Sequence, residues 1–266
     1  MRWLFDLVRR LPGGSVKISW TWEIGSKPRG IVRKNPFASL LEDFFPKAVT
    51  KRDNFFAAET HHEEPMSFPD TYPKADQRFN GQMKVGGSFL NGLPQGVTVH
   101  YTADRDLDRT VRALVARELG YHLLITRDGT VHQCAPLTKT MWHAGRAVWG
   151  LLSPNKTHVA ISIVSWGEVE QLAPGAYEAW NGSTVPTKEV EQRLGDRYWD
   201  IATPEQEASL VDALVWLCGK GIDWTQICGH DECALPKGRK SDPGGVIQMT
   251  MEQLRYAVAS KIEAAV

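Results

Sequence analysis

The pattern of apolar and polar residues changes character near residue 90. Before that point prolines recur and the apolar segments between them are short. One stretch alternates apolar with polar residues at period two, as a strand does: Val16, Ile18, Trp20, Trp22 and Ile24. A short capped helix is expected after Asn35-Pro36, and residues 60–95 are typical of loop. We therefore interpret residues 1–90 as an N-terminal extension or small accessory module, whose fold the sequence leaves uncertain.

Beyond residue 92 the pattern predicts well-defined strands. The expected strands are 96–102, 122–127, 130–135, 158–166 and 226–228. Asp128-Gly129 separates the second of these from the third and is a strong signal for a hairpin turn. The segment 158–166 is apolar enough to lie inside a sheet.

Helices are expected between these strands. Apolar residues follow helical spacing from residue 107 to 119, and Thr203-Pro204 with Gln206 is typical of a capped helix start. A final helix is expected from Thr250 to Ala259. A glycine- and proline-punctuated stretch, 167–202, is predicted to be an insertion. The fold class is therefore mixed α/β (α+β), with a central mixed β-sheet flanked by helices in a domain of residues 91–266.

Composition and charge narrow the range of functions. The 31 basic and 31 acidic residues cancel, so the balance gives no sign of a nucleic-acid partner. No apolar run approaches the roughly 20 residues of a transmembrane segment. Asp6, Arg9 and Arg10 interrupt the apolar start before a signal-peptide core can form. We expect synthesis in the cytoplasm without a signal peptide, and free thiols at the four cysteines.

Three residues are candidate metal ligands. His100 lies in a predicted strand, and His230 and Asp242 flank a glycine-rich loop. Two imidazoles and one carboxylate suit a catalytic zinc site with a fourth position left for water. A single strand histidine is more often structural, so the residues alone leave that alternative open. Cys228 and Cys233 bracket His230, which leaves a structural zinc site as a second alternative, although such a site needs four ligands.

Four segments occur in an order that resembles a known family. They are VHYTA at 99–103, GYHLLITRDGTVHQ at 120–133, WHAG at 142–145 and GHDECALPKGRKSDPGG at 229–245. Together they resemble the N-acetylmuramoyl-L-alanine amidase family, which shares its fold with peptidoglycan recognition proteins. The resemblance covers roughly residues 92–260.

The resemblance implies a zinc cofactor (Zn2+) and a set of roles. His100, His230 and Asp242 resemble the three zinc ligands of the family. Lys240 resembles the lysine that stabilises the oxyanion of the reaction. Tyr121 resembles the tyrosine that phage-type members place beside the zinc-bound water.

The WHAG segment and one strand position add further expectations. His143 resembles a residue of the substrate groove, and Trp142 is expected to pack beneath that groove and to contribute to substrate binding. Many family members carry a glutamate where this chain has Ser162, which cannot act as a carboxylate base. Tyr121 is therefore the expected residue for positioning or deprotonating the water, as in phage-type members.

These expectations describe a peptidoglycan hydrolase. The predicted reaction is cleavage of the amide between N-acetylmuramic acid and L-alanine in peptidoglycan or a muropeptide, by a zinc-activated water. The expected setting is a phage-type lysin that acts on the cell wall after release or delivery. The alternatives are a cytosolic muropeptide-recycling amidase and a non-catalytic recognition module. Residues 1–90 are the candidate contact for a phage particle or an intracellular protein partner.

Overall fold

The computed structural model describes residues 3–11, 14–22 and 67–264, and in the first two ranges it describes the backbone alone. The chain divides into two compact units, Met1–His62 and Glu63–Val266. In the first unit, β1 (Trp3–Leu11) pairs antiparallel with β2 (Gly14–Trp22), and Trp3 is opposite Trp22. The alternation predicted from Val16 onward lies in β2 as far as Trp22, whereas residues 23–24 and the helix expected after Asn35-Pro36 lie outside the described residues.

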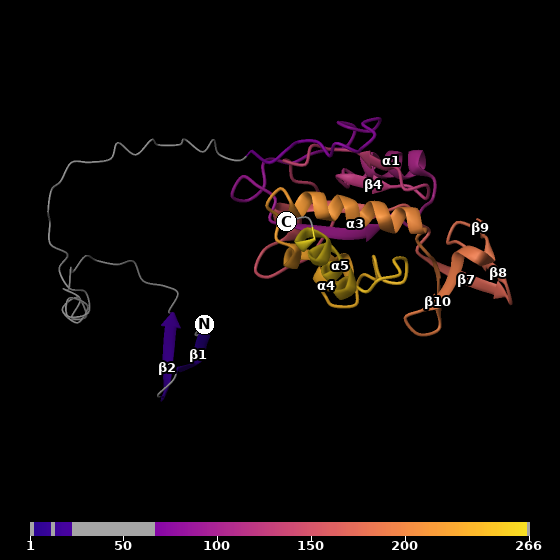
Figure 1. Ribbon diagram of the computed structural model, residues 1–266. Helices are drawn as coiled ribbons and strands as arrows, with labels where there is room; N and C mark the ends of the chain where they lie inside the picture. The colour runs from indigo at the N-terminus through magenta and orange to yellow at the C-terminus, as the bar shows by residue number, and fades with distance from the viewer. Residues whose placement is uncertain (1–2, 12–13, 23–66, 265–266) are drawn as a thin grey trace. The chain divides into compact units, whose positions relative to one another are not determined.

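The second unit is built on a mixed five-stranded sheet (Figure 1). Its strands follow the order β12 (Ile227–Gly229), β3 (Gly96–Tyr101), β6 (His158–Ile163), β4 (Leu123–Ile125) and β5 (Val131–Gln133). The first four are parallel, and β5 returns antiparallel through the predicted hairpin. The strands predicted in this domain and the mixed α/β class are confirmed.

Side chains alternate between the two faces of this sheet, as strand geometry requires. Val97 and Val99 of β3 join a core that includes α3 (Pro204–Cys218) and α5 (Met251–Glu263). Leu124 of β4 packs in a second core, on the side of α1 (Leu107–Ala116). The helices therefore cover both faces, and His100 lies on the face opposite α3 and α5.

The insertion between β6 and α3 forms a sheet of its own, which the sequence did not predict. Its order is β10 (Val190–Arg193), β11 (Arg197–Asp200), β7 (Glu168–Ala173), β8 (Ala176–Glu178) and β9 (Thr184–Val185), all antiparallel. Gly175 and Gly195 turn two of its hairpins at φ of 78° and 88°, a region that favours glycine. Figure 1 shows this sheet at one end of α3.

A buried carboxylate ties this second sheet to the rest of the unit. Asp200, at the end of β11, is fully buried and accepts hydrogen bonds from the Trp166 backbone (2.7 Å) and the Ser165 hydroxyl (3.0 Å). Arg105 and Arg127 both form ion pairs with it. A buried charge needs such partners, so this network fixes the sheet in place.

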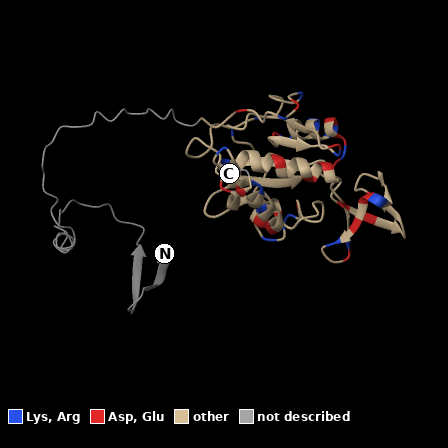
Figure 2. Ribbon diagram, in the orientation of Figure 1, with Lys and Arg blue, Asp and Glu red and all other residues tan. Residues whose placement is uncertain are grey.

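Charged side chains of both signs are interspersed over the helices and the second sheet (Figure 2). This distribution agrees with the zero net charge of the chain. Among the residues that the structure describes, no helix is long and apolar enough to cross a membrane.

Residues 67–90 belong to the second unit, so the boundary predicted at residue 90 falls inside it. Their buried side chains are Phe68, Tyr72, Phe79, Met83 and Phe89. The Tyr72 backbone N–H also donates to Oε1 of Gln133, the last residue of β5, at 2.9 Å. The sequence alone did not predict this contribution, because the apolar residues here are sparse and Pro69 and Pro73 interrupt the segment as they would a helix.

A protein truncated to residues 91–266 is therefore expected to be unfolded, whereas residues 63–266 should fold. The five buried side chains contribute about 8–15 kcal/mol at roughly 1.5–3 kcal/mol each. That matches the entire net stability of a typical domain, about 5–15 kcal/mol. Circular dichroism during heating distinguishes the two, and a cooperative unfolding transition in the 91–266 protein would contradict the assignment.

Candidate metal centre

His100 reaches the site from β3, an interior strand of the sheet that lies between β12 and β6. It is the fifth residue of β3 and pairs in register with Ser162 of the neighbouring β6. Its side chain is fully buried. The alternation that sends Val97 and Val99 into the α3 and α5 core sends His100 to the other face.

His230 and Asp242 come from the two ends of one loop. Strand β12 ends at Gly229, and His230 is the first residue of the short helix α4 (His230–Cys233). The Asp231 backbone N–H donates to the carbonyl of Asp242 at 2.7 Å, which joins the two ends. A β-carbon on Gly229 would lie 2.8 Å from Pro243 Cδ, so the close approach requires glycine.

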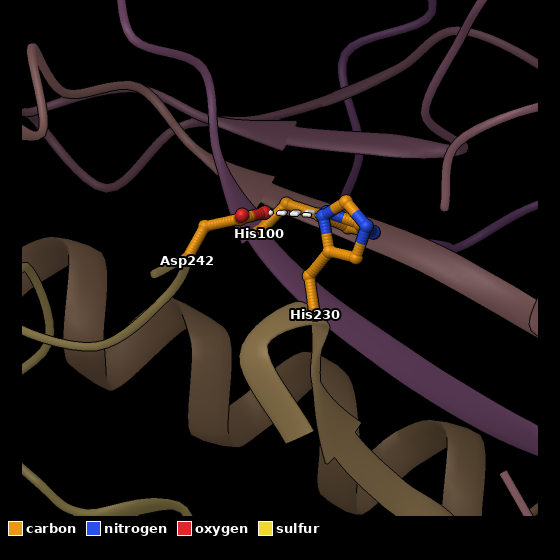
Figure 3. Close-up of side chains that lie close together, drawn as sticks. All are labelled: His100, His230 and Asp242. Atoms are coloured by element: carbon orange, nitrogen blue, oxygen red, sulfur yellow. Dashed lines mark hydrogen bonds and ion pairs between the residues drawn. The ribbon is translucent and has the colours of Figure 1, made fainter. Parts of the chain in front are cut away.

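The three side chains converge on one point (Figure 3). Asp242 Oδ2 lies 2.8 Å from Nδ1 of His100 and 2.8 Å from Nδ1 of His230. The two Nδ1 atoms are 3.1 Å apart, and the three ligand atoms all lie within 4.8 Å of one another. Two imidazole nitrogens and a carboxylate oxygen that face each other in a buried space fit a divalent metal ion, and this donor set is one that zinc favours.

The electrostatics keep these groups in the forms that bind metals. Burial lowers the pKa of His100 to about 4, against the opposing effect of Asp242. Burial alone would raise the pKa of Asp242, but the imidazoles of His100 and His230, each 2.8 Å from its Oδ2, outweigh burial and hold that pKa well below its usual range. At neutral pH the site therefore offers a neutral His100 and an ionised carboxylate.

The WHAG segment, residues 142–145, contacts both histidines of the cluster. Nδ1 of His143 is 3.0 Å from Nε2 of His100, and Nε2 of His230 is 2.9 Å from the carbonyl of Ala144. His143 is 9% exposed, whereas Trp142 is 56% exposed. The expected positions of the two residues are thus reversed. Trp142 is exposed, and His143 is buried against His100, a candidate metal ligand.

Tyr121 lies beside the cluster, at the start of the hairpin. Its ring centroid is 5.0 Å from that of His100. Burial and the nearby Asp242 carboxylate raise the pKa of Tyr121 above its ordinary value, with Ser162 opposing the shift. The Tyr121 hydroxyl is therefore neutral at physiological pH and can both donate and accept a hydrogen bond.

Ser162 lies on the same face as His100, one strand over. Its hydroxyl is fully buried and has no hydrogen-bond partner of normal geometry among the described residues. Ser162 thus supplies a hydroxyl, and no carboxylate, on the face of the sheet that carries His100.

Lys240 is exposed on the loop that leads to Asp242, two residues before it. It makes no hydrogen bond or ion pair with any residue that the structure describes. After the larger effect of burial, its positive charge adds to the lowering of the His100 pKa, so the ammonium group acts on the cluster. An exposed cation beside a metal centre is suited to meeting negative charge on a substrate.

The alternative structural zinc site at Cys228 and Cys233 does not form. Both thiols are free and buried in a small apolar cluster with Ala144 and Ala147. Burial raises the pKa of Cys228 well above its ordinary value, which disfavours the thiolate that zinc requires. Within the described residues, the only convergent group of metal-binding side chains is His100, His230 and Asp242.

The arrangement is suited to metal-assisted hydrolysis. A family model described as N-acetylmuramoyl-L-alanine amidase matches residues 91–245, more than half of the chain. The protein therefore belongs to the N-acetylmuramoyl-L-alanine amidase family and is an enzyme of that class.

Several solved structures are similar to this chain over part of its length. A selenomethionine derivative of AmpD is 17% identical, covers 71% of this chain and 97% of its own, and gives a TM-score of 0.47. AmiD from E. coli, in complex with the substrate anhydro-N-acetylmuramic acid-L-Ala-D-gamma-Glu-L-Lys, is 21% identical with coverage of 62% and 57% and a TM-score of 0.46. The endolysin amidase LysCS from Clostridium intestinale URNW is 17% identical with coverage of 71% and 98% and a TM-score of 0.45. No curated protein matches the sequence.

Proposed function

We propose that the protein is a zinc-dependent amidase that hydrolyses the bond between the lactyl group of N-acetylmuramic acid and L-alanine. The observation that carries this proposal is the convergence of His100 Nδ1, His230 Nδ1 and Asp242 Oδ2 in a buried space. Three lone pairs directed at one point repel each other unless a cation lies between them. His100, His230 and Asp242 would hold the zinc ion.

A bound zinc ion supplies a Lewis acid that polarises the amide carbonyl and lowers the pKa of a water molecule from 15.7 to about 7. The chain's own groups complete the chemistry. The neutral Tyr121 hydroxyl holds the attacking water by a hydrogen bond at the side of His100. Lys240 brings its ammonium group to the carbonyl oxygen as negative charge develops there.

Replacing Tyr121 with phenylalanine is expected to lower kcat by about 100-fold while zinc content and fold stay unchanged. The variant keeps the ring against His100 and removes only the hydroxyl that positions the water, a contribution typical of acid–base groups. Tyr256→Phe is the matched control, because Tyr256 is 73% exposed on α5. Near-normal turnover in Tyr121→Phe would remove Tyr121 from the mechanism.

Metal titration tests the proposal itself. We expect chelation to abolish amidase activity and stepwise addition of zinc to restore it, with a break at one equivalent per chain. An open site with three protein ligands binds one ion. Full activity in protein shown by elemental analysis to contain no metal would refute the zinc-dependent function.

Retention of Asp242 favours hydrolysis over the alternative of a non-cleaving recognition module. A module that only binds muropeptide needs no carboxylate held ionised between two buried imidazoles. Because burying a charge costs stability, a buried carboxylate at this position indicates a functional role.

We further propose that the enzyme is a phage-type lysin. Tyr121 beside the cluster and serine at position 162 support this, since the site lacks a carboxylate base among its described residues. A lysin acts on intact cell wall, so purified sacculi should lose turbidity when the protein is added. Activity confined to small soluble muropeptides would favour the recycling role instead.

A further inference from the structure

We propose that the loop carrying His143 and Ala144 sets the tautomer of both histidines of the metal cluster, with His143 acting as a positioning residue. The inference rests on the proposed zinc function, because a histidine binds a metal only through a nitrogen without a proton. At both ligands that nitrogen is Nδ1, so each Nε2 must carry the proton.

For His230 the partner is a simple one. Its Nε2 lies 2.9 Å from the carbonyl oxygen of Ala144. A carbonyl can only accept a hydrogen bond, so Nε2 carries the proton and Nδ1 is left bare toward the cluster. This is the usual way in which a protein orients a metal-binding histidine.

For His100 the partner is another imidazole, which is ambiguous by itself. Nε2 of His100 faces Nδ1 of His143 at 3.0 Å, and either ring could be the donor. His100 is fully buried, so water cannot replace this contact. A third group is needed to decide which ring donates.

The carbonyl of Pro154 is that group. Nε2 of His143 lies 3.3 Å from this oxygen, whose other lone pair accepts the backbone N–H of His158. Since the oxygen only accepts, Nε2 of a neutral His143 carries the proton and its Nδ1 must accept. Nε2 of His100 therefore donates, and Nδ1 of His100 is left bare toward Asp242 and His230.

Asn155 holds this loop in place. Its side-chain oxygen accepts the backbone N–H groups of His143 (3.0 Å) and Ala144 (2.9 Å), and its amide donates to the carbonyl of Gly145 (2.8 Å). Asn155 is 3% exposed and directly follows Pro154 in the chain. The two adjacent residues thus fix both the backbone and the ring of His143.

Two substitutions separate this role from simple packing. His143→Leu fills much of the space but cannot accept from His100. His143→Asn places an amide oxygen at the position of Nδ1, because both atoms branch from the γ-carbon, and so it can still accept. We expect His143→Leu to raise the Kd for zinc by about 10- to 100-fold, the usual effect of losing such a partner. The Kd of His143→Asn should be at least about tenfold lower than that of His143→Leu.

Zinc affinity is measured by competition with a chromogenic chelator, and the tautomers are read by 15N NMR of histidine-labelled protein. The His143 signals are identified among the eight histidines by their loss in His143→Asn. We expect the His143 proton on Nε2 in both metal-free and zinc-loaded protein. A proton on Nδ1 of His143, or wild-type zinc affinity in His143→Leu, would overturn the inference. Failure of the wild-type protein to bind zinc would instead refute the proposed function, and the tautomer of His143 in the metal-free protein would still decide the inference.

Discussion

The Asp242→Asn variant is expected to lose its zinc and nearly all of its turnover. Asparagine has the same shape, so packing is preserved while the charge between His100 and His230 is removed. Structural zinc sites with four ligands bind with apparent free energies of about 10–16 kcal/mol, which is about 2.5–4 kcal/mol per ligand. Loss of one ligand therefore predicts a drop in zinc affinity of at least about 100-fold.

Zinc content after dialysis and amidase rate are measured together for this variant. Asp196→Asn is the control, because Asp196 is an exposed aspartate in the turn between β10 and β11. A folded Asp242→Asn protein that kept one zinc per chain and normal turnover would show that Asp242 is not a ligand.

Lys240→Ala is expected to lower kcat by about 100- to 1,000-fold without changing zinc content. Removal of a single donor that stabilises an oxyanion has an effect of this size. The side chain is exposed, so its loss should leave the free energy of unfolding nearly unchanged. The effect should appear in kcat more than in KM, because the charge it meets develops only in the transition state.

Lys237→Ala is the matched control for this variant. Lys237 is an exposed lysine on the same loop, and its ammonium group donates to the carbonyl of Glu232. The two variants remove the same charge from the same loop. Equal losses of turnover in both would mean that the loop acts through its general positive charge, and not through Lys240.

Local sequence patterns predicted the strands of the central sheet, and the resemblance to the amidase family predicted the grouping of His100, His230 and Asp242. The parallel strands are short and rich in β-branched residues, and His100 follows Val97 and Val99 with strict alternation. His230 and Asp242 are far from His100 in sequence, yet the parallel pairing of β12 with β3 brings them together. Local patterns suffice for the strands, because each strand carries its own signal, but the pairing of the strands is a tertiary feature that they do not show.

The second sheet could not be predicted from local patterns. Its strands are two to six residues long and mostly exposed on one face, so apolar periodicity is weak. The sheet depends on a small core around Trp166, Val169 and Val185 and on the buried Asp200 network. Both are tertiary features, formed by residues that are distant in sequence.

The directions of the Trp142 and His143 side chains could not be predicted from the sequence either. Trp142 and His143 are neighbours without a strand or helix to fix their directions. Hydrogen bonds to Asn155 and Pro154, some eleven residues away, turn His143 inward. The exposed Trp142 ring, with the Lys156 ammonium group 5.9 Å from its centroid, remains a predicted contact for substrate.

Mass spectrometry of a purified muropeptide after digestion is the most direct measurement of the central claim. Zinc-loaded protein should release two products: a sugar with a free lactyl carboxyl group, and an intact stem peptide that begins with a free L-alanine amino group. Metal-stripped protein should leave the muropeptide uncut. Cleavage within the glycan or within the peptide, or the same two products from metal-stripped protein, would contradict a zinc-dependent N-acetylmuramoyl-L-alanine amidase.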